Sequence, residues 1–256
     1  DLFEVKESRV RTRGEHRLAA GDDGLTLERR WRDDVRSVRI QADGWTATDA
    51  GTLTVDVVVP ARGEWSGCLM VRPSVDGEEF PTRYACGEPV ERAVPAQRLL
   101  EWRLANPVVH TTHPGLAALL ERTREDLGSL RIFDPEHPDR VAVAAGAPWF
   151  MTVFGRDSLL TAWMALLLDP ALALGTLRTL ARFQGTEVDP RSDQEPGKVL
   201  HEMRFGTDSA HSLDGGSVYY GSIDATPLFV MLLGELESWG ADPADVRALL
   251  PAADRA

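Results

Sequence analysis

The fold is decided by residues 147–169, APWFMTVFGRDSLLTAWMALLLD. This stretch joins an aromatic-rich polar loop to a run, from Leu159 to Leu168, in which only Thr161 is polar. A helix that is apolar all round is buried on every side. A bilayer span needs about twenty apolar residues, so the run is too short to cross a membrane. We therefore expect a buried helix over residues 157–168, inside a soluble protein.

Polar residues mark the start of this expected helix. Asp157 or Ser158 is expected to cap it, because either side chain can accept a bond from an unpaired backbone N–H. Arg156 and Asp157 then lie at the mouth of a buried helix, where charge is costly unless it is paired or used. This stretch alone leaves two interpretations open: a capping pair with a local salt bridge, or a functional pair.

The bulk composition is that of an acidic globular protein. The chain has 256 residues, a net charge of −12 and a pI near 5.0. One or two domains are expected from this length. The negative charge argues against nucleic acid or an anionic membrane as a partner. A cytoplasmic location is expected because no signal peptide is visible. The chain starts at Asp1 without a methionine, which leaves room for a preceding segment that carries a targeting signal.

The cysteines give little sign of metal or redox chemistry. Cys68 and Cys86 form no CxxC motif and no Cys/His cluster. We expect two half-buried thiols rather than a disulfide.

Residues 1–104 have the pattern of an antiparallel β-sandwich. Short runs rich in Val, Ile, Thr and Trp alternate with turn clusters that contain Gly, Asp and Pro. The expected strands are Leu2–Lys6, Leu25–Trp31, Val35–Ile40, Thr52–Val59 and Ser66–Val71. Arginines in this half are expected to line solvated strand faces rather than a binding patch; they are Arg9, Arg11, Arg13, Arg29, Arg30, Arg32 and Arg36.

Residues 105–256 have a helical pattern in which the connections alternate between long and short. The expected helices cover residues 114–130, 157–168, 170–183, 222–239 and 243–251. Amphipathic helices alternate with apolar ones, and a short joint makes antiparallel neighbours of the two helices it links. The long connections, 131–156 and 186–221, should therefore lie on one rim, at the N-terminal ends of the apolar helices. This layout predicts a toroid of α-hairpins; an ordinary helical bundle with two large loops is the alternative.

The long connections carry most of the reactive side chains, as long loops in compact domains often do. Carboxylates accept bonds from vicinal hydroxyls, Arg and Lys donate them, and aromatic faces stack on a pyranose ring. Such side chains on one rim suit a neutral sugar. Zinc is disfavoured because His201-Glu202 lacks the second His of HExxH. No Gly-rich phosphate loop is present, and we expect neither a metal nor a cofactor.

Three motifs resemble one enzyme family. They are GAPWFMTVFGRDSLLTAWMALL, EPGKVLHEMRFG and YYGSIDATPLFVMLLGE, and they extend over residues 146–235. They look like the bacterial glycogen-debranching, amylo-α-1,6-glucosidase-type family of (α/α)6 glycoside hydrolases. The GRDS step also resembles the TRDS step of glucoamylases. The β-rich half looks like the N-terminal domain of the same debranching family, entered partway through.

The resemblance implies a fold and a set of substrate-binding residues. The implied fold is α+β and multidomain: a β-sandwich over 1–104, then the first hairpins of an incomplete (α/α)6 toroid over 105–256. Arg156 and Asp157 would hold hydroxyls of the terminal sugar. The other residues implied to line that pocket, together with Trp149 of the first loop, are Lys198, His201, Glu202, Arg204, Tyr220 and Asp224.

The catalytic pair of that family is not expected in this chain. Glycoside hydrolysis needs one protonated and one ionised carboxyl group. The family places its general acid in a later Trp-Met-Asp-like motif and its base near the end of the toroid, so both are expected beyond Ala256. From the residues alone, Asp157, Glu202 and Asp224 would be the acid and base candidates, ranked below a substrate-holding role.

The resemblance implies hydrolysis of α-glucosidic bonds of an α-glucan, in particular the α-1,6 branches of a glycogen-like substrate, by the parent protein. Alternatives are another α-glycosidase of the same fold, acting on trehalose or a short oligosaccharide, or a non-catalytic carbohydrate-binding or interaction module.

A truncated toroid should expose apolar surface. The expected partner of that surface is the missing C-terminal part of its own barrel, and the isolated chain should aggregate and be inactive. Three other helices and a sandwich are not expected to cover all of the following apolar residues: Leu159, Met164, Leu167, Phe229, Met231 and Leu232.

Overall fold

The computed structural model describes residues 14–256 with the exception of 83–84, 135, 149 and 204–217. The chain divides into two compact units, and the division falls between Arg98 and Leu99. The expected strand at residues 2–6, and Arg9, Arg11 and Arg13, lie outside the described residues.

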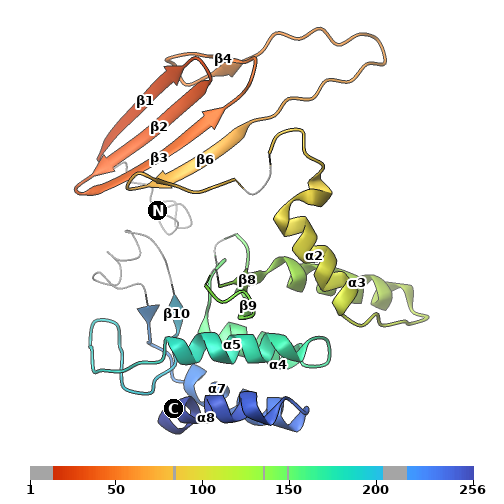
Figure 1. The fold of residues 1–256 in the computed structure, drawn as a ribbon, viewed down its shortest axis with the longest axis vertical. Coiled ribbons are helices and arrows are strands. Elements are labelled where there is room, and N and C mark those ends of the chain that lie inside the picture. The colour runs from red at the N-terminus through yellow and green to blue at the C-terminus, as the bar shows by residue number, and fades with distance from the viewer. Residues whose placement is uncertain (1–13, 83–84, 135, 149, 204–217) are drawn as a thin grey trace. The chain divides into compact units, whose positions relative to one another are not determined.

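The first unit is built on an antiparallel sheet in the order β1-β2-β3-β6-β7 (Figure 1). Its strands are β1 (Glu15–Gly21), β2 (Gly24–Trp31), β3 (Asp34–Gln41), β6 (Met70–Val75) and β7 (Glu78–Glu79), and a separate ribbon pairs β4 (Thr46–Ala47) with β5 (Leu53–Thr54). The expected strands at residues 25–31 and 35–40 are confirmed as β2 and β3. β1 was not expected, and the strand expected at 66–71 begins later, at Met70.

The register of this sheet collects apolar residues on one face. Leu18 pairs with Leu27, and Leu25 pairs with Ile40, which in turn pairs with Val71. Several of these side chains, Leu18, Leu27 and Val71 among them, remain partly exposed in the described structure. An apolar sheet face is what a second packed layer would cover. The strand pairing confirms the antiparallel sheet. The second layer that would make it a sandwich stays a prediction.

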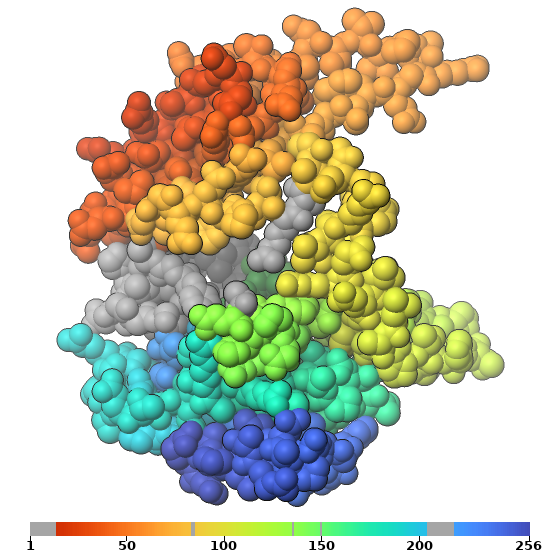
Figure 2. Space-filling view, in the orientation of Figure 1, coloured from red at the N-terminus to blue at the C-terminus, as the bar shows by residue number. Residues whose placement is uncertain are grey.

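The expected strand at residues 52–59 is wrong over most of its length. Only Leu53–Thr54 pairs, and the following segment loops out from the sheet before it returns to β6, as Figure 1 and Figure 2 show. Val58 is 95% exposed. A run of β-branched residues forms a strand only where a neighbouring strand offers hydrogen bonds, and here the described structure offers none beyond β4.

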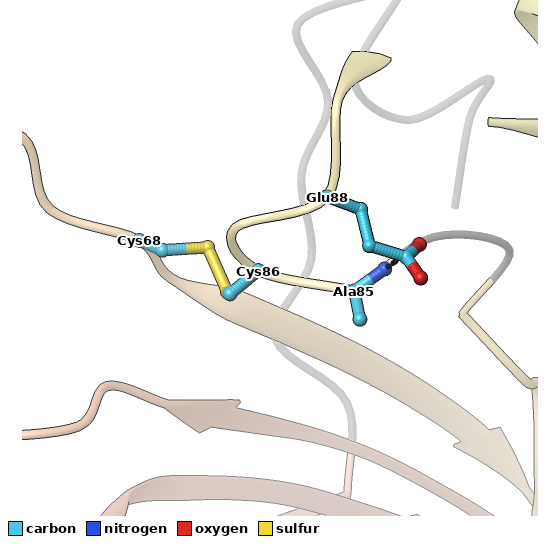
Figure 3. Close-up of a disulfide and its surroundings, with 4 residues drawn as sticks. All are labelled: Cys68, Ala85, Cys86 and Glu88. Atoms are coloured by element: carbon cyan, nitrogen blue, oxygen red, sulfur yellow. Dashed lines mark hydrogen bonds between the residues drawn. A yellow bond between two sulfur atoms is a disulfide. The ribbon is translucent and has the colours of Figure 1, made fainter. Parts of the chain in front are cut away.

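The expectation of free thiols is also wrong. Cys68 and Cys86 form a disulfide across a separation of 18 residues (Figure 3). It joins the segment that leads into β6 to the turn in which the Ala85 N–H donates to Glu88 Oε2 at 3.2 Å. Disulfides persist mainly in oxidising compartments, so the cytoplasmic location stays a prediction. The described chain has no helix that is both long and apolar enough to span a membrane.

Helices dominate the second unit, and the first of them spans the division between Arg98 and Leu99. They are α2 (Val94–Ala105), α3 (Pro114–Ser129), α4 (Gly155–Met164), α5 (Pro170–Arg182), α7 (Ala225–Ser238) and α8 (Pro243–Arg255); a 3-10 turn, η1 (Val90–Arg92), precedes them. Short strand pairs join β8 (Arg131–Phe133) to β9 (Val141–Val143) and β10 (Glu202–Met203) to β11 (Val218–Tyr219). An α+β layout is confirmed at this level, and the toroid stays a prediction.

Local chemistry sets the starts of α5 and α8. The Asp169 carboxylate accepts from the Ala171 N–H, and that of Asp242 accepts from the Ala244 N–H. Each cap is followed by a proline at the first helical position, whose missing N–H costs nothing there. α8 does not end at Pro251 as expected but runs on to Arg255. Ala252, the residue after Pro251, is buried in the core.

α2 is a helix within the stretch expected to be β up to residue 104. Its stability comes from tertiary contacts, because Trp102 is buried against Val143 and Leu172. The Trp102 Nε1–H donates to the Arg124 carbonyl at 2.8 Å, which ties α2 to α3. No local pattern of apolar residues announces these contacts.

The core of the second unit lies where α4, α5, α7 and α8 pack, with α5 between β9 and α8 (Figure 1). Contrary to expectation, α4 is not buried on every side. The helix expected to reach residue 168 ends at Met164. Leu160 and Met164, four residues apart on α4, are exposed, with Met164 78% exposed, and Leu167 is exposed in the turn that follows. Six apolar side chains were not expected to be all buried. Met164, Leu167 and Met231 are exposed, whereas Leu159, Phe229 and Leu232 are buried. α4 and α7 therefore each bury one face against α5 and its neighbours and expose part of the opposite face.

Candidate functional site

An ion pair joins the N-termini of α4 and α7. Arg156, in the first turn of α4, donates from Nη1 to Asp224 Oδ2 at 3.0 Å across 68 residues of sequence. Asp224 is the N-cap residue of α7. Arg156 Nε lies 3.9 Å from Asp157 Oδ2. All three side chains are partly exposed, so charged groups from two helix starts face solvent together.

The start of α4 is closed by backbone packing rather than by a side-chain cap. A Cβ at Gly155 would lie 2.0 Å from the Leu200 carbonyl oxygen and 2.9 Å from the Ala225 Cβ. The Gly155 N–H donates to the His201 carbonyl at 2.9 Å. The close approach of the second long loop to α4 thus requires a residue without a side chain.

The expected cap by Asp157 or Ser158 is wrong. The N-cap residue is Phe154, which forms no side-chain cap bond. Ser158 is buried and its Oγ donates to the Val143 carbonyl at 2.7 Å, which fastens α4 to β9. Asp157 lies in the first turn, where the positive end of the helix dipole stabilises a carboxylate.

Hydrogen bonds hold Asp224 in its ionised form. The Ser222 hydroxyl, which donates to Asp224 Oδ1, lowers the pKa of this carboxyl group most, and the bond from Arg156 lowers it further against the opposing effect of burial. A general acid needs a raised pKa. Asp224 is therefore suited to accept hydrogen bonds and not to donate a proton at neutral pH.

His201 and Glu202 lie beside the start of α4. The His201 N–H donates to the Tyr219 carbonyl at 2.7 Å, and its ring is edge-to-face with Phe154 and Tyr219. His201 Nδ1 has no hydrogen-bond partner among the described residues. The backbone of Glu202 pairs with that of Tyr219 in the β10–β11 ribbon and forms an isolated antiparallel β-bridge with Phe154.

Two other predicted residues have structural partners. Lys198 Nζ donates to the Asp193 carbonyl at 2.9 Å and lies 3.3 Å from the Asp193 carboxylate, so it braces its own loop. Tyr220 is buried and donates its hydroxyl to the Phe183 carbonyl at 2.8 Å; burial raises the pKa of this phenol. Trp149 and Arg204 lie outside the described residues.

Sequence reasoning gave no role to Ser222 and Thr226. Ser222 orients Asp224, and Thr226 Oγ1 accepts from the Val199 N–H at 2.9 Å. A serine two residues before an aspartate is typical of local side-chain bonding, which is the signal that could have found Ser222. The Val199–Thr226 bond spans 27 residues of sequence, so no local pattern signals it. In the described part of the chain, no three His, Cys, Asp or Glu side chains gather in a way suited to a metal ion.

Comparison with protein families connects the N-terminal part of the chain with a known family. Residues 1–70 match the family described as the N-terminal domain of (some) glycogen debranching enzymes. This match supports that family at a coarse level. It agrees with the resemblance seen in the β-rich half, whereas the three motifs over residues 146–235 lie outside the matched range. A search of curated proteins finds no match.

Replacing Gly155 with alanine should destabilise the second unit by about 1–3 kcal/mol, the usual cost of overpacking. The added methyl would meet backbone atoms of Leu200, which cannot turn away as a flexible side chain could. Gly234→Ala in α7 is the matched control, because a Cβ there meets nothing within 4 Å. It should stabilise by about 0.5–1 kcal/mol. Urea unfolding midpoints measure both, and equal midpoints would contradict the close approach.

The Asp224 carboxyl group should titrate below the ordinary aspartate pKa of 3.8. Because its pKa is lowered on folding, its stabilising bonds are complete above pH 3.8 and are lost as the pH falls through the lower, folded value. Carbon-13 shifts of labelled aspartate carboxyls measure the midpoint, with Asp224→Asn to assign the signal. Ser222→Ala should move the midpoint upward. A midpoint at or above 3.8 would show that the bonds from Ser222 and Arg156 do not hold in solution.

Proposed function

We propose that this chain is part of a glycoside hydrolase that cleaves α-glucosidic bonds of an α-glucan, in particular the α-1,6 branches of a glycogen-like substrate. The match of residues 1–70 to glycogen debranching enzymes, which are glycoside hydrolases, carries this proposal. In the proposed architecture, α4 and α7 are inner helices of an (α/α)6 toroid and their N-termini lie on its substrate rim.

The proposed task of the rim is to hold sugar hydroxyls. The ionised Asp224 accepts hydrogen bonds, and Arg156 keeps further N–H groups for donation because only part of its guanidinium faces Asp224. Asp157, His201 and Glu202 add polar groups beside them. The lowered pKa of Asp224 suits this holding role, and the acid and base of the reaction are proposed to be other carboxyl groups.

The test is hydrolysis by the full-length protein that contains this chain. Glucose release from a phosphorylase limit dextrin is expected. Release from trehalose instead would favour the related α-glycosidase, and sugar binding without turnover would favour a binding module. A protein that neither binds nor cleaves an α-glucan would overturn the proposal.

The rim is tested with Arg156→Ala and Asp224→Asn. Each should lower kcat/KM on limit dextrin about 10–100-fold, because a hydrogen bond that involves a charged group contributes about 1.5–3 kcal/mol. Arg122→Ala is the matched control, since Arg122 forms an exposed ion pair with Asp126 within α3. Unchanged kcat/KM in both rim variants would remove the rim from the substrate site and leave the activity itself standing.

A further inference from the structure

The first unit contains a cleft that no site described above uses. It has a volume of about 470 Å³ and lies between the turn after β3, the segment that leads into β6, and Cys86. This volume falls within the ~300–1,000 Å³ typical of small-ligand sites. Every residue that lines the cleft belongs to the first unit, so the cleft is complete without the helices.

Two tryptophans form the aromatic part of the cleft. The ring centroids of Trp45 and Trp65 are 5.9 Å apart and the rings are tilted by 46°. Trp65 is 47% exposed, so much of its ring is open to a ligand. Gly67 permits this arrangement, because a Cβ there would lie 2.7 Å from Trp65 Cη2 and 3.0 Å from Trp45 Cζ2.

Polar groups beside the rings are already oriented. Arg72 donates from Nη1 to Gln41 Oε1 at 2.6 Å, and Gln41 donates from Nε2 to Asp23 Oδ2 at 2.6 Å. This chain of bonds fixes both side chains where they line the cleft. Asp43 is exposed at the same cleft and makes no hydrogen bond or ion pair with any described residue, which leaves its carboxylate open as an acceptor.

We propose that this cleft binds a neutral oligosaccharide, as a second sugar site separate from the rim. Indole faces stack on the apolar face of a pyranose, while a carboxylate, an amide and a guanidinium together match the donors and acceptors of vicinal hydroxyls. A proline-rich peptide also docks on aromatic rings, but it has no hydroxyls for the polar groups of this cleft. That the sugar is an α-glucan rests on the function proposed above.

The Cys68–Cys86 disulfide forms part of the cleft wall. Cys68 directly follows Gly67, the residue that lies against both indole rings. Figure 3 shows the disulfide joining Cys68 to the turn that holds Cys86. Because Trp65 lies three residues before Cys68, the disulfide also keeps its segment beside that turn. A reductant should therefore weaken sugar binding by this cleft as well as destabilise the sheet.

Titration of the 256-residue chain with maltoheptaose and affinity electrophoresis in glycogen-containing gels test the site. Trp65→Ala and Trp45→Ala should each weaken binding at least tenfold, whereas Trp65→Tyr should retain most of it. Trp239→Ala is the matched control, because Trp239 is 50% exposed in the second unit, and it should bind like the wild type.

The outcomes separate the cleft from the function proposed above. Unchanged binding in both tryptophan-to-alanine variants would overturn the sugar site, whatever the hydrolytic activity. Binding of a polyproline peptide with no binding of maltoheptaose would overturn it in favour of a peptide groove. Glycogen binding that depends on Trp65, in a full-length protein that does not cleave limit dextrin, would uphold the cleft and count against the hydrolase.

Discussion

Replacing Phe229 with alanine is expected to destabilise the helical unit by about 3–5 kcal/mol, the cost typical of removing a fully buried phenylalanine. Phe229 lies on α7, is 0% exposed, and belongs to the cluster that joins α4, α5, α7 and α8. Because a domain is stable by only about 5–15 kcal/mol, this loss is a large share of the margin. A urea titration followed by far-UV circular dichroism measures it.

Met231 on the same helix provides the matched control. It is also a large apolar residue, but it is 50% exposed. Met231→Ala should therefore change stability by less than about 1 kcal/mol. Similar losses in the two variants would mean that α7 is buried on both faces in solution, as its composition alone predicts. Such a result would point to a further layer against the exposed face.

Removing the disulfide with Cys68→Ser and Cys86→Ser together is expected to destabilise the sheet unit by about 3 kcal/mol. This figure follows from the loop-closure entropy of the 18-residue separation. The described core of this unit is small: of its described large apolar side chains only Leu25, at 4% exposed, is buried. A cross-link therefore contributes a large part of the stability here, as it does in small domains.

Hydrogen exchange at the amides of β3 and β6 measures this loss, since these strands pair next to the cross-linked segment. A reductant should reproduce the faster exchange in the wild type and have no further effect on the double variant. The amides of α5, in the other unit, should exchange at the same rate in both proteins. If exchange in β3 and β6 does not change, the thiols are not paired in solution, and the expectation from the sequence was right.

Several elements could be predicted from the sequence because short-range physics decides them. The helices that begin at Pro114, Pro170 and Pro243 follow a side-chain cap and a proline, which act within one turn. The hairpin of β2 and β3 follows from two β-rich runs with a tight turn between them. The sequence also predicts that polar residues of the long loops lie near the starts of the apolar helices, and their arrangement as the rim of a toroid stays a prediction.

Other features depend on residues far apart in the chain. Sequence reasoning found Arg156 and Asp224 as candidates but not their pairing, because the ion pair forms only once α4 and α7 pack together. It did not find the partners of two other candidates: the Lys198 ammonium donates to the Asp193 carbonyl, and the Tyr220 hydroxyl donates to the Phe183 carbonyl. Their place in the sugar pocket stays a prediction. Residue type states what bonds a side chain can make, and the partner depends on the fold.

The sequence by itself determined where α3, α5 and α8 begin, that most of β2 and β3 are strands, and which residue types the long loops bring to the helix starts. Tertiary structure alone decided that the two cysteines pair, that residues 94–105 are helical, and that α4 and α7 bury one face and expose the other. The physical reason is the range of the interactions. Caps, turns and periodicity act within a few residues, whereas burial and pairing depend on the segments that folding brings into contact.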